Sequence, residues 1–117
     1  MGKRRVKYSP EEVTLLILNK PLYYAVAKAL FTADRPLHAS EISRIIKKST
    51  GEDVSPGYVY VILQKLEKWG VAEPVKDPLN GRLTFKPSNK KVARLLREEI
   101  MKREAREIEE LIKVSEE

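Results

Sequence analysis

The 117-residue sequence predicts a mainly α-helical fold with a small β-ribbon, because three patterns in the middle of the chain follow one another in a set order. An amphipathic helix is predicted over residues 37–48, and a second helix over residues 55–70. Two short extended segments, 71–76 and 82–86, come next and are joined by a turn. Helix, turn, helix and β-ribbon in this order are typical of a winged helix-turn-helix.

The second helix of this pair carries its own start and stop signals. Ser55 is a favourable N-cap, Pro56 suits the first helical position, and Gly70 suits the position just past the end. Apolar residues at spacings of four and three form a stripe that we expect to be buried: Val59, Leu63 and Leu66. The opposite face carries Gly57, Tyr58, Val61, Gln64, Lys65 and Lys68. An aromatic ring, an amide and cations together favour contact with nucleic acid, although most amphipathic helices with such a face are merely solvated.

The turn between the extended segments contains Asn80-Gly81, a strong hairpin signal. Pro74 lies inside the first segment and therefore indicates an edge strand or a bulge. In the first helix of the pair, Ile42, Ile45 and Ile46 share one face. The only histidine, His38, stands at its start, where capping or solvent exposure is expected rather than catalysis.

Three segments make up the expected organisation of the chain. A capping box at Ser9 and Glu12 opens an N-terminal helix, and Pro21 breaks or restarts it. From residue 88 or 89 onward no Gly or Pro interrupts a long C-terminal helix. The predicted parts are a basic arm over 1–8, a winged helix-turn-helix domain over 9–88, and a C-terminal helix over 89–117.

The C-terminal helix carries apolar residues along its length, and about 25 residues would extend about 37 Å. This is longer than the core of so small a domain needs, so we expect its apolar face to pair with a second copy and form a homodimer. The alternative is a helix that folds back onto its own domain. The expected dimer contacts are Val92, Leu96, Ile100, Ala105, Ile108 and Ile112.

The net charge of +6 is unevenly distributed. The arm over 1–8 carries +4, and we expect Lys3, Arg4 and Arg5 to follow a DNA backbone or enter a minor groove, unless this segment is only a solubilising terminus. With no cysteine, one histidine and no phosphate-binding glycine pattern, we expect no enzyme activity, no metal and no cofactor. No apolar run reaches the roughly 20 residues that span a bilayer, so a cytoplasmic protein is expected. High charge with little Asn and Gln favours a thermophilic source.

The runs 36–42, 55–71 and 80–88 keep the order and spacing of a known motif set. The recognition-helix positions are Ser55, Gly57, Tyr60, Leu63, Leu66, Glu67 and Gly70. In these positions the chain resembles the PadR-like winged-helix regulators, and small archaeal plasmid centromere-binding proteins resemble that family too. Ala39-Ser40 replaces the family's Gly-Tyr pair, and the wing has few basic and aromatic residues. The resemblance implies a DNA-binding dimer with a dimerising C-terminal helix.

The expected mode of binding places the second helix in the major groove, with its N-terminal half near base edges. The residues assigned to bases are Tyr58, Val61, Gln64 and Lys65. Those assigned to phosphate are Ser55, Gly57 and Tyr60. Arg82 and Lys86 on the wing would touch phosphate or the minor groove, and Lys68 is a further expected DNA contact. Tyr60 could instead pack at the edge of the core. A twofold dimer would read a palindrome.

Three functions remain open from these residues. The first is a dimeric transcriptional regulator. The second is a partition or DNA-organising protein that spreads from a palindrome. The third is a winged helix that binds protein, as in some complex subunits. Besides DNA and a second copy, a polymerase or a partition component could be a further partner.

Overall fold

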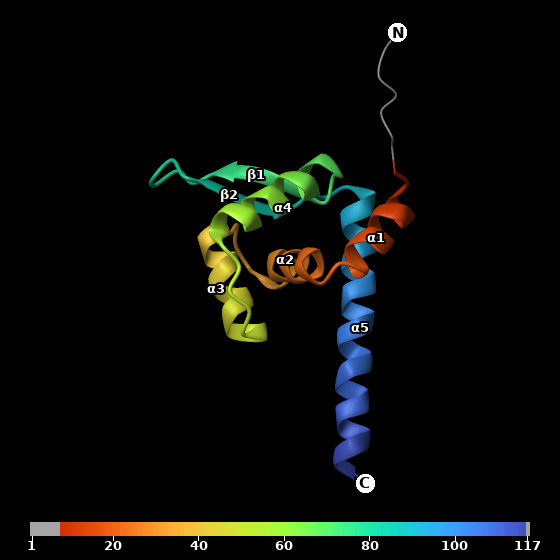
Figure 1. The fold of residues 1–117 in the computed structure, drawn as a ribbon. Helices are drawn as coiled ribbons and strands as arrows, with labels where there is room; N and C mark the ends of the chain where they lie inside the picture. The colour runs from red at the N-terminus through yellow and green to blue at the C-terminus, as the bar shows by residue number, and fades with distance from the viewer. Residues whose placement is uncertain (1–7, 117) are drawn as a thin grey trace.

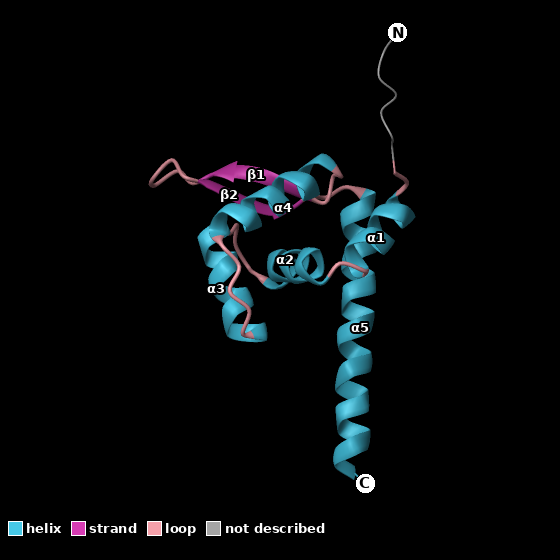
Figure 2. Ribbon diagram, viewed as in Figure 1, coloured by secondary structure: helices cyan, strands magenta, loops and turns pink. Residues whose placement is uncertain are grey.

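The computed structural model describes residues 8–116, which form five helices and one two-stranded antiparallel sheet. The predictions for Lys3, Arg4 and Arg5 lie outside these described residues. The fold class predicted from the sequence is confirmed, since the elements follow one another as in a winged helix (Figures 1 and 2). In chain order they are α1 (Pro10–Leu18), α2 (Pro21–Thr32), α3 (Ala39–Thr50), α4 (Pro56–Lys68), β1 (Ala72–Lys76), β2 (Leu83–Pro87) and α5 (Lys91–Glu116).

Local signals set the first two helices. The Ser9 hydroxyl accepts the Glu12 amide at 3.1 Å, and the Ser9 amide donates to the Glu12 carboxylate at 2.9 Å, which completes the expected capping box. The hydrogen bond from the Ser9 amide is also the main reason that the pKa of Glu12 is lowered. Pro21 begins α2 after a short break, because proline is tolerated in the first turn of a helix.

All five helices and the ribbon contribute to a single core. Its largest fully buried side chains come from every element except β1, and each buried aliphatic side chain contributes on the order of 1.5–3 kcal/mol. They are Ile17, Val26, Leu30, Ile42, Ile46, Val59, Ile62, Leu63, Leu66, Phe85, Leu96 and Ile100. Ile45, expected on the same face as Ile42 and Ile46, is 40% exposed and lies at the edge of this core.

The first half of α5 belongs to the body of the domain. Val92, Leu96 and Ile100 are 7%, 0% and 0% exposed within the single chain. The expectation that these three residues contact a second copy is therefore wrong, because α1 and α2 already cover them. The body extends into α5 beyond residue 88, and the alternative of a helix folded onto its own domain holds for this half.

A polar cluster marks the point where α5 leaves the body. The Lys28 ammonium lies 2.6 Å from the Glu104 carboxylate, and the Tyr24 hydroxyl donates to the same carboxylate at 3.4 Å. Arg103 donates to the Leu18 carbonyl at 3.3 Å. Beyond this cluster, residues 105–116, here called the tail, are exposed and project from the body (Figure 1). In the part of the chain that the structure describes, no helix is long and apolar enough to cross a membrane.

Candidate nucleic-acid interface

The helix α4 begins and ends where the sequence predicts. The Ser55 hydroxyl accepts the Tyr58 amide at 3.1 Å and thereby caps the first turn. Pro56 is the first helical residue. At the other end Gly70 adopts φ +83°, a left-handed conformation that glycine takes without strain. Ser55 is thus engaged as a cap, while its neighbour Gly57 has open space on its exposed side.

The two faces of α4 differ completely. Val59, Leu63 and Leu66 are fully buried, as expected. Tyr58 is 47% exposed and Val61 is 52% exposed, although both are large apolar or aromatic side chains. The other exposed residues of this surface are Gly57, Gln64, Lys65 and Lys68. We call these six residues the reading face.

The reading face is the side of α4 that the rest of the body leaves uncovered. The buried side of α4 packs against α2, α3 and β1, and in Figure 1 α2 and α3 lie below α4 while the ribbon lies above it. The tail projects from the body beyond these elements (Figure 1).

Two side-chain contacts hold the second half of the turn between α3 and α4 against α3. The Ser43 hydroxyl donates to the Val54 carbonyl, and the Lys47 ammonium lies 3.0 Å from the Asp53 carboxylate. Gly51 ends α3 in a left-handed conformation, φ +81°. These contacts fix the angle at which α4 leaves α3, which is the geometry that a helix-turn-helix requires.

Tyr60 lies on the side of α4 that faces the ribbon. Its ring packs edge-on against Phe85, with 6.1 Å between the ring centroids, and 38% of the residue remains exposed. Of the two roles expected for this tyrosine, the arrangement matches packing at the edge of the core. Its exposed part lies beside the ribbon.

The ribbon explains the proline in its first strand. Pro74 is paired with Phe85 in the register of β1 and β2. The amide and the carbonyl of Phe85 both bond to Leu37 on the other side of β2. Pro74 therefore stands where no ladder hydrogen bond is needed from it, which is the position that tolerates proline.

The loop between the strands, the wing loop, is held by its own polar residues. The Asp77 carboxylate accepts the Leu79 amide at 2.9 Å, and the Asn80 side chain accepts the Arg82 amide at 2.9 Å. Arg82 is exposed just before β2, and within the described residues its guanidinium forms no ion pair. The Lys86 ammonium lies 3.3 Å from Glu73 on the neighbouring strand, so part of its charge is already compensated.

Residues near His38 join the wing loop to α3. The His38 ring places Nδ1 3.3 Å from the Leu83 carbonyl oxygen and Nε2 3.7 Å from the Asp77 carboxylate. Glu41 accepts the His38 amide at 2.9 Å and lies 2.6 Å from the Arg35 guanidinium. The hydrogen bond from Arg35, followed by that from the His38 amide, lowers the pKa of Glu41 to about 2.

Sequence reasoning did not assign the start of α5 to this surface. The Ser88 hydroxyl donates to the Gly70 carbonyl, and the Lys90 side chain lies against Gly70, so the first turn of α5 adjoins the last turn of α4. Lys90 and Lys91 thereby stand beside the end of the helix that carries Lys68. A signal was present, because residues 86–97 contain five cations and no acid.

In the residues that the structure describes, no three His, Asp or Glu side chains gather in a way that could hold a metal ion. No family model matches this chain, and no curated protein sequence matches it. A solved structure of similar fold is that of the ferric uptake regulator Fur of Helicobacter pylori, described as having three functional metal-binding sites. The match has a TM-score of 0.55 and 19% identity and covers 75% of this chain. It covers 64% of the Fur chain, less than two thirds of its length, and at this identity it supports the fold alone.

Proposed function

We propose that this protein binds double-stranded DNA sequence-specifically through the reading face, as a transcriptional regulator of the PadR-like type. The observation that carries the proposal is the contrast between the two sides of α4. A helix whose inner side is fully buried carries Tyr58 and Val61 about half exposed beside Gln64, Lys65 and Lys68 on its outer side. The similar fold of Fur, a regulator by name, supports this assignment.

In the proposed complex α4 enters the major groove and the wing loop lies on the flanking backbone. Gln64 has the amide that pairs with adenine, and Lys65 can donate to guanine. Tyr58 and Val61 supply apolar contact to base edges. Arg82, and Lys86 once Glu73 releases it, contact phosphate or the minor groove without reading sequence.

The tail is the proposed dimer contact. Ala105, Ile108 and Ile112 are exposed and lie beyond the part of α5 that the body covers. Val92, Leu96 and Ile100 have no part in this proposal, because they are buried within the chain. A dimer would let two reading faces bind at once and so raise the affinity for paired sites.

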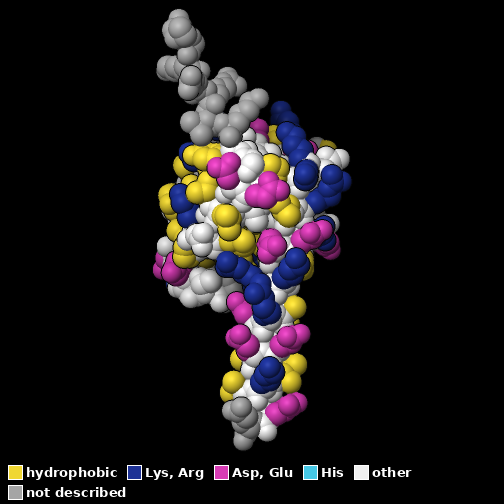
Figure 3. All heavy atoms as spheres, turned by 90° about the vertical axis from the view of Figure 1, so that its right-hand side faces the viewer, with side chains coloured by type: hydrophobic (Ala, Val, Ile, Leu, Met, Phe, Trp, Pro, Cys, Tyr) yellow, Lys and Arg dark blue, Asp and Glu magenta, His cyan; other side chains and the backbone are white. Residues whose placement is uncertain are grey.

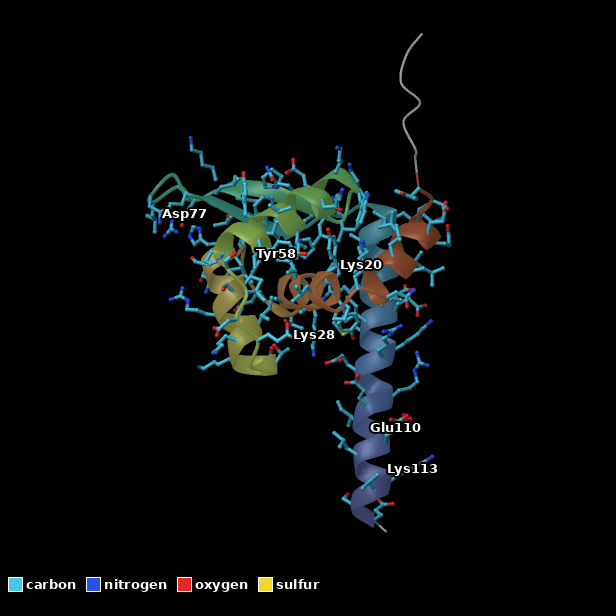
Figure 4. All side chains as sticks on the ribbon, viewed as in Figure 1. Lys20, Lys28, Tyr58, Asp77, Glu110 and Lys113 are labelled. Carbon is cyan, nitrogen blue, oxygen red and sulfur yellow. The ribbon has the colours of Figure 1, made fainter. Side chains whose placement is uncertain are left out.

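The test begins with selection of bound duplexes from a random library at one moderate salt concentration. Affinities for the selected duplex and for a scrambled duplex are then measured for Gln64→Ala and Arg82→Ala. We expect Gln64→Ala to lower the preference for the selected duplex by about 5- to 100-fold, and Arg82→Ala to weaken both duplexes alike. Lys113→Ala is the matched control, since Lys113 is an exposed cation on the tail, far from Tyr58 and Asp77 (Figure 4).

Two results would contradict the proposal. Equal losses on both duplexes from Gln64→Ala and Arg82→Ala would remove the division between base and phosphate contacts. Failure of selection to enrich any sequence, with no binding to scrambled duplex either, would favour a winged helix that binds protein.

A DNA-organising role is the second candidate. The observation that favours it is the exposed tail with Ala105, Ile108 and Ile112, which projects from the body and could join neighbouring copies (Figure 1). Protection of DNA that spreads outward from one site as the protein concentration rises would support this role, whereas a footprint of constant length would support a local regulator.

A further inference from the structure

The exposed side of α5 carries a short heptad stripe. Met101, Ala105, Ile108 and Ile112 recur at spacings of four, three and four, which corresponds to alternating d and a positions of a coiled coil. Met101 is 42% exposed, Ile108 is 57% exposed and Ile112 is 51% exposed. Figure 3 shows hydrophobic side chains on this part of the molecule among acidic and basic ones.

This stripe is distinct from the side of α5 that packs on the body. The buried residues of α5 end with Ile100, and successive residues of an α-helix are about 100° apart around its axis. Met101 therefore points well away from the body, and the later members of the stripe follow it. The stripe is open to a second helix along its whole length.

The charges beside the stripe differ in how they suit the two possible orientations of a second copy. In a parallel pair, each g residue faces the e residue five positions later in the partner. Arg97 would then face Lys102 of the partner subunit, and Glu104 would face the partner's Glu109. Both are like-charge contacts. The charge of Glu104 is partly compensated, because Glu104 already pairs with Lys28 in its own chain. The contact of Arg97 with Lys102 therefore disfavours a parallel pair more strongly than the contact of Glu104 with Glu109.

An antiparallel pair brings opposite charges together. The a and d layers then alternate, so that Met101 meets Ile112 of the partner subunit and Ala105 meets the partner's Ile108. In this register e faces e, and Lys102 lies beside the partner's Glu109 twice in each dimer. Lys102 and Glu109 are both exposed in the single chain. Lys102 lies 3.7 Å from Glu99 of its own chain, and this largely exposed pair would loosen when Lys102 contacts the partner's Glu109.

We propose that two copies pair antiparallel through residues 101–112, and that the resulting dimer joins two separate duplexes. The tail projects from the body, so reversing one copy places the two bodies, each with its own reading face, at opposite ends of the paired tails (Figure 1). Such a dimer bridges two DNA segments, each read by one copy, and does not place both copies on one face of a palindrome. The bridging step rests on the proposed DNA binding, whereas the antiparallel pairing does not.

The orientation is tested without DNA, by measuring the dimer dissociation constant of the full chain with sedimentation. Lys102→Glu would put two glutamates side by side in an antiparallel pair, and we expect the dissociation constant to rise about five- to tenfold. In a parallel pair the same change would place the introduced carboxylate beside the partner's Arg97 and would strengthen the dimer. Combining Lys102→Glu with Glu109→Lys should restore the wild-type value.

Lys113→Glu is the matched control for this measurement. Lys113 follows Glu109 by four residues as Lys102 follows Glu98, so both changes introduce an acid four residues after another acid of the same helix. Lys113 lies outside the a, d, e and g positions of the stripe. We expect its substitution to leave the dissociation constant unchanged, and a stronger dimer from Lys102→Glu would overturn the antiparallel pairing.

Bridging is tested with a selected duplex fixed to beads and the same duplex, labelled, in solution. We expect the wild-type chain to capture the labelled duplex, and the double change Ile108→Asp and Ile112→Asp to abolish capture while binding to a single duplex persists. Val114→Asp, at a position 70% exposed but off the stripe, should still capture. Binding to single duplexes with no capture by the wild-type chain would overturn bridging and leave the proposed DNA binding standing. Loss of all duplex binding would instead refute the proposed function, with the sedimentation result still deciding the orientation.

Discussion

The amide of Leu37 donates to the carbonyl of Phe85, and the amide of Phe85 donates back to the carbonyl of Leu37, each at 2.9 Å. Leu37 lies just before α3, and Phe85 is the central residue of β2. Through this pair of bonds Leu37 extends the ribbon on the free side of β2. The bonds thereby join the wing to the residue that leads into α3. The position of the wing relative to α4 therefore depends on contacts between residues that are far apart in the sequence.

Phe85→Ala should be the most damaging single change in the ribbon. The Phe85 side chain is 1% exposed and also supports the ring of Tyr60. We expect a loss of about 3–5 kcal/mol in the free energy of unfolding, because the change leaves a cavity in the core. Urea denaturation followed by the fluorescence of the single tryptophan, Trp69, measures this. Phe85→Leu, which fills most of the space, should cost much less, and equal losses from the two changes would contradict the cavity explanation.

Gly70→Ala should also destabilise the fold, for a reason of backbone conformation. Gly70 has φ +83°, and an added Cβ would lie 3.3 Å from Lys90 Cδ and 3.4 Å from Val92 Cγ1. The left-handed conformation alone costs a non-glycine residue roughly 1–2 kcal/mol. We expect a loss of about that size in urea denaturation, and an unchanged midpoint would show that the turn after α4 can relax.

Gly57→Ala should separate stability from DNA binding. Gly57 lies in α4, and a Cβ built there meets nothing within 4 Å. Alanine favours a helix over glycine by about 0.5–1 kcal/mol, so we expect the protein to become slightly more stable. If the reading face lies against DNA as proposed, the added methyl group should nevertheless weaken duplex binding. A more stable protein with unchanged duplex affinity would place Gly57 outside the DNA contact.

The parts of the fold that the sequence predicts correctly depend on local signals. Ser55 and Gly70 set the ends of α4, and the turn at Asn80-Gly81 joins the strands where expected. The assignment of Leu96 to a dimer contact is wrong because apolar periodicity identifies a face that needs covering, without identifying what covers it. The pairing of Leu37 with β2 has no local signal at all.

In the candidate site, too, the residues with a local sequence signal are predictable, and those placed by packing are not. The exposed side of α4 is predictable, since it is the complement of a clear apolar stripe. The addition of Lys90 and Lys91 to this surface depends on how α5 packs beside the end of α4. Charge along the chain indicates that the segment is basic, but only the packing places it next to Lys68.

Acid stability should depend on Glu41. Its pKa is lowered from 4.5 to about 2, first by the hydrogen bond from Arg35 and then by that from the His38 amide. A lowered pKa in the folded state means that the carboxylate stabilises the fold above pH 4.5, and that this contribution is lost as the pH falls toward 2. Because the Arg35 side chain is 59% exposed, water screens the pair, and we expect a contribution of about 1–2 kcal/mol.

Glu41→Gln should therefore lower the free energy of unfolding at neutral pH and flatten its decline between pH 4.5 and 2. Arg35→Gln should have a similar but smaller effect, because the His38 amide still bonds the carboxylate. Glu110→Gln, on the tail and far from this cluster, should retain the wild-type slope (Figure 4). Urea denaturation at a series of pH values measures all three. A wild-type acid slope in Glu41→Gln would show that the titration of Glu41 does not set the acid stability of the fold.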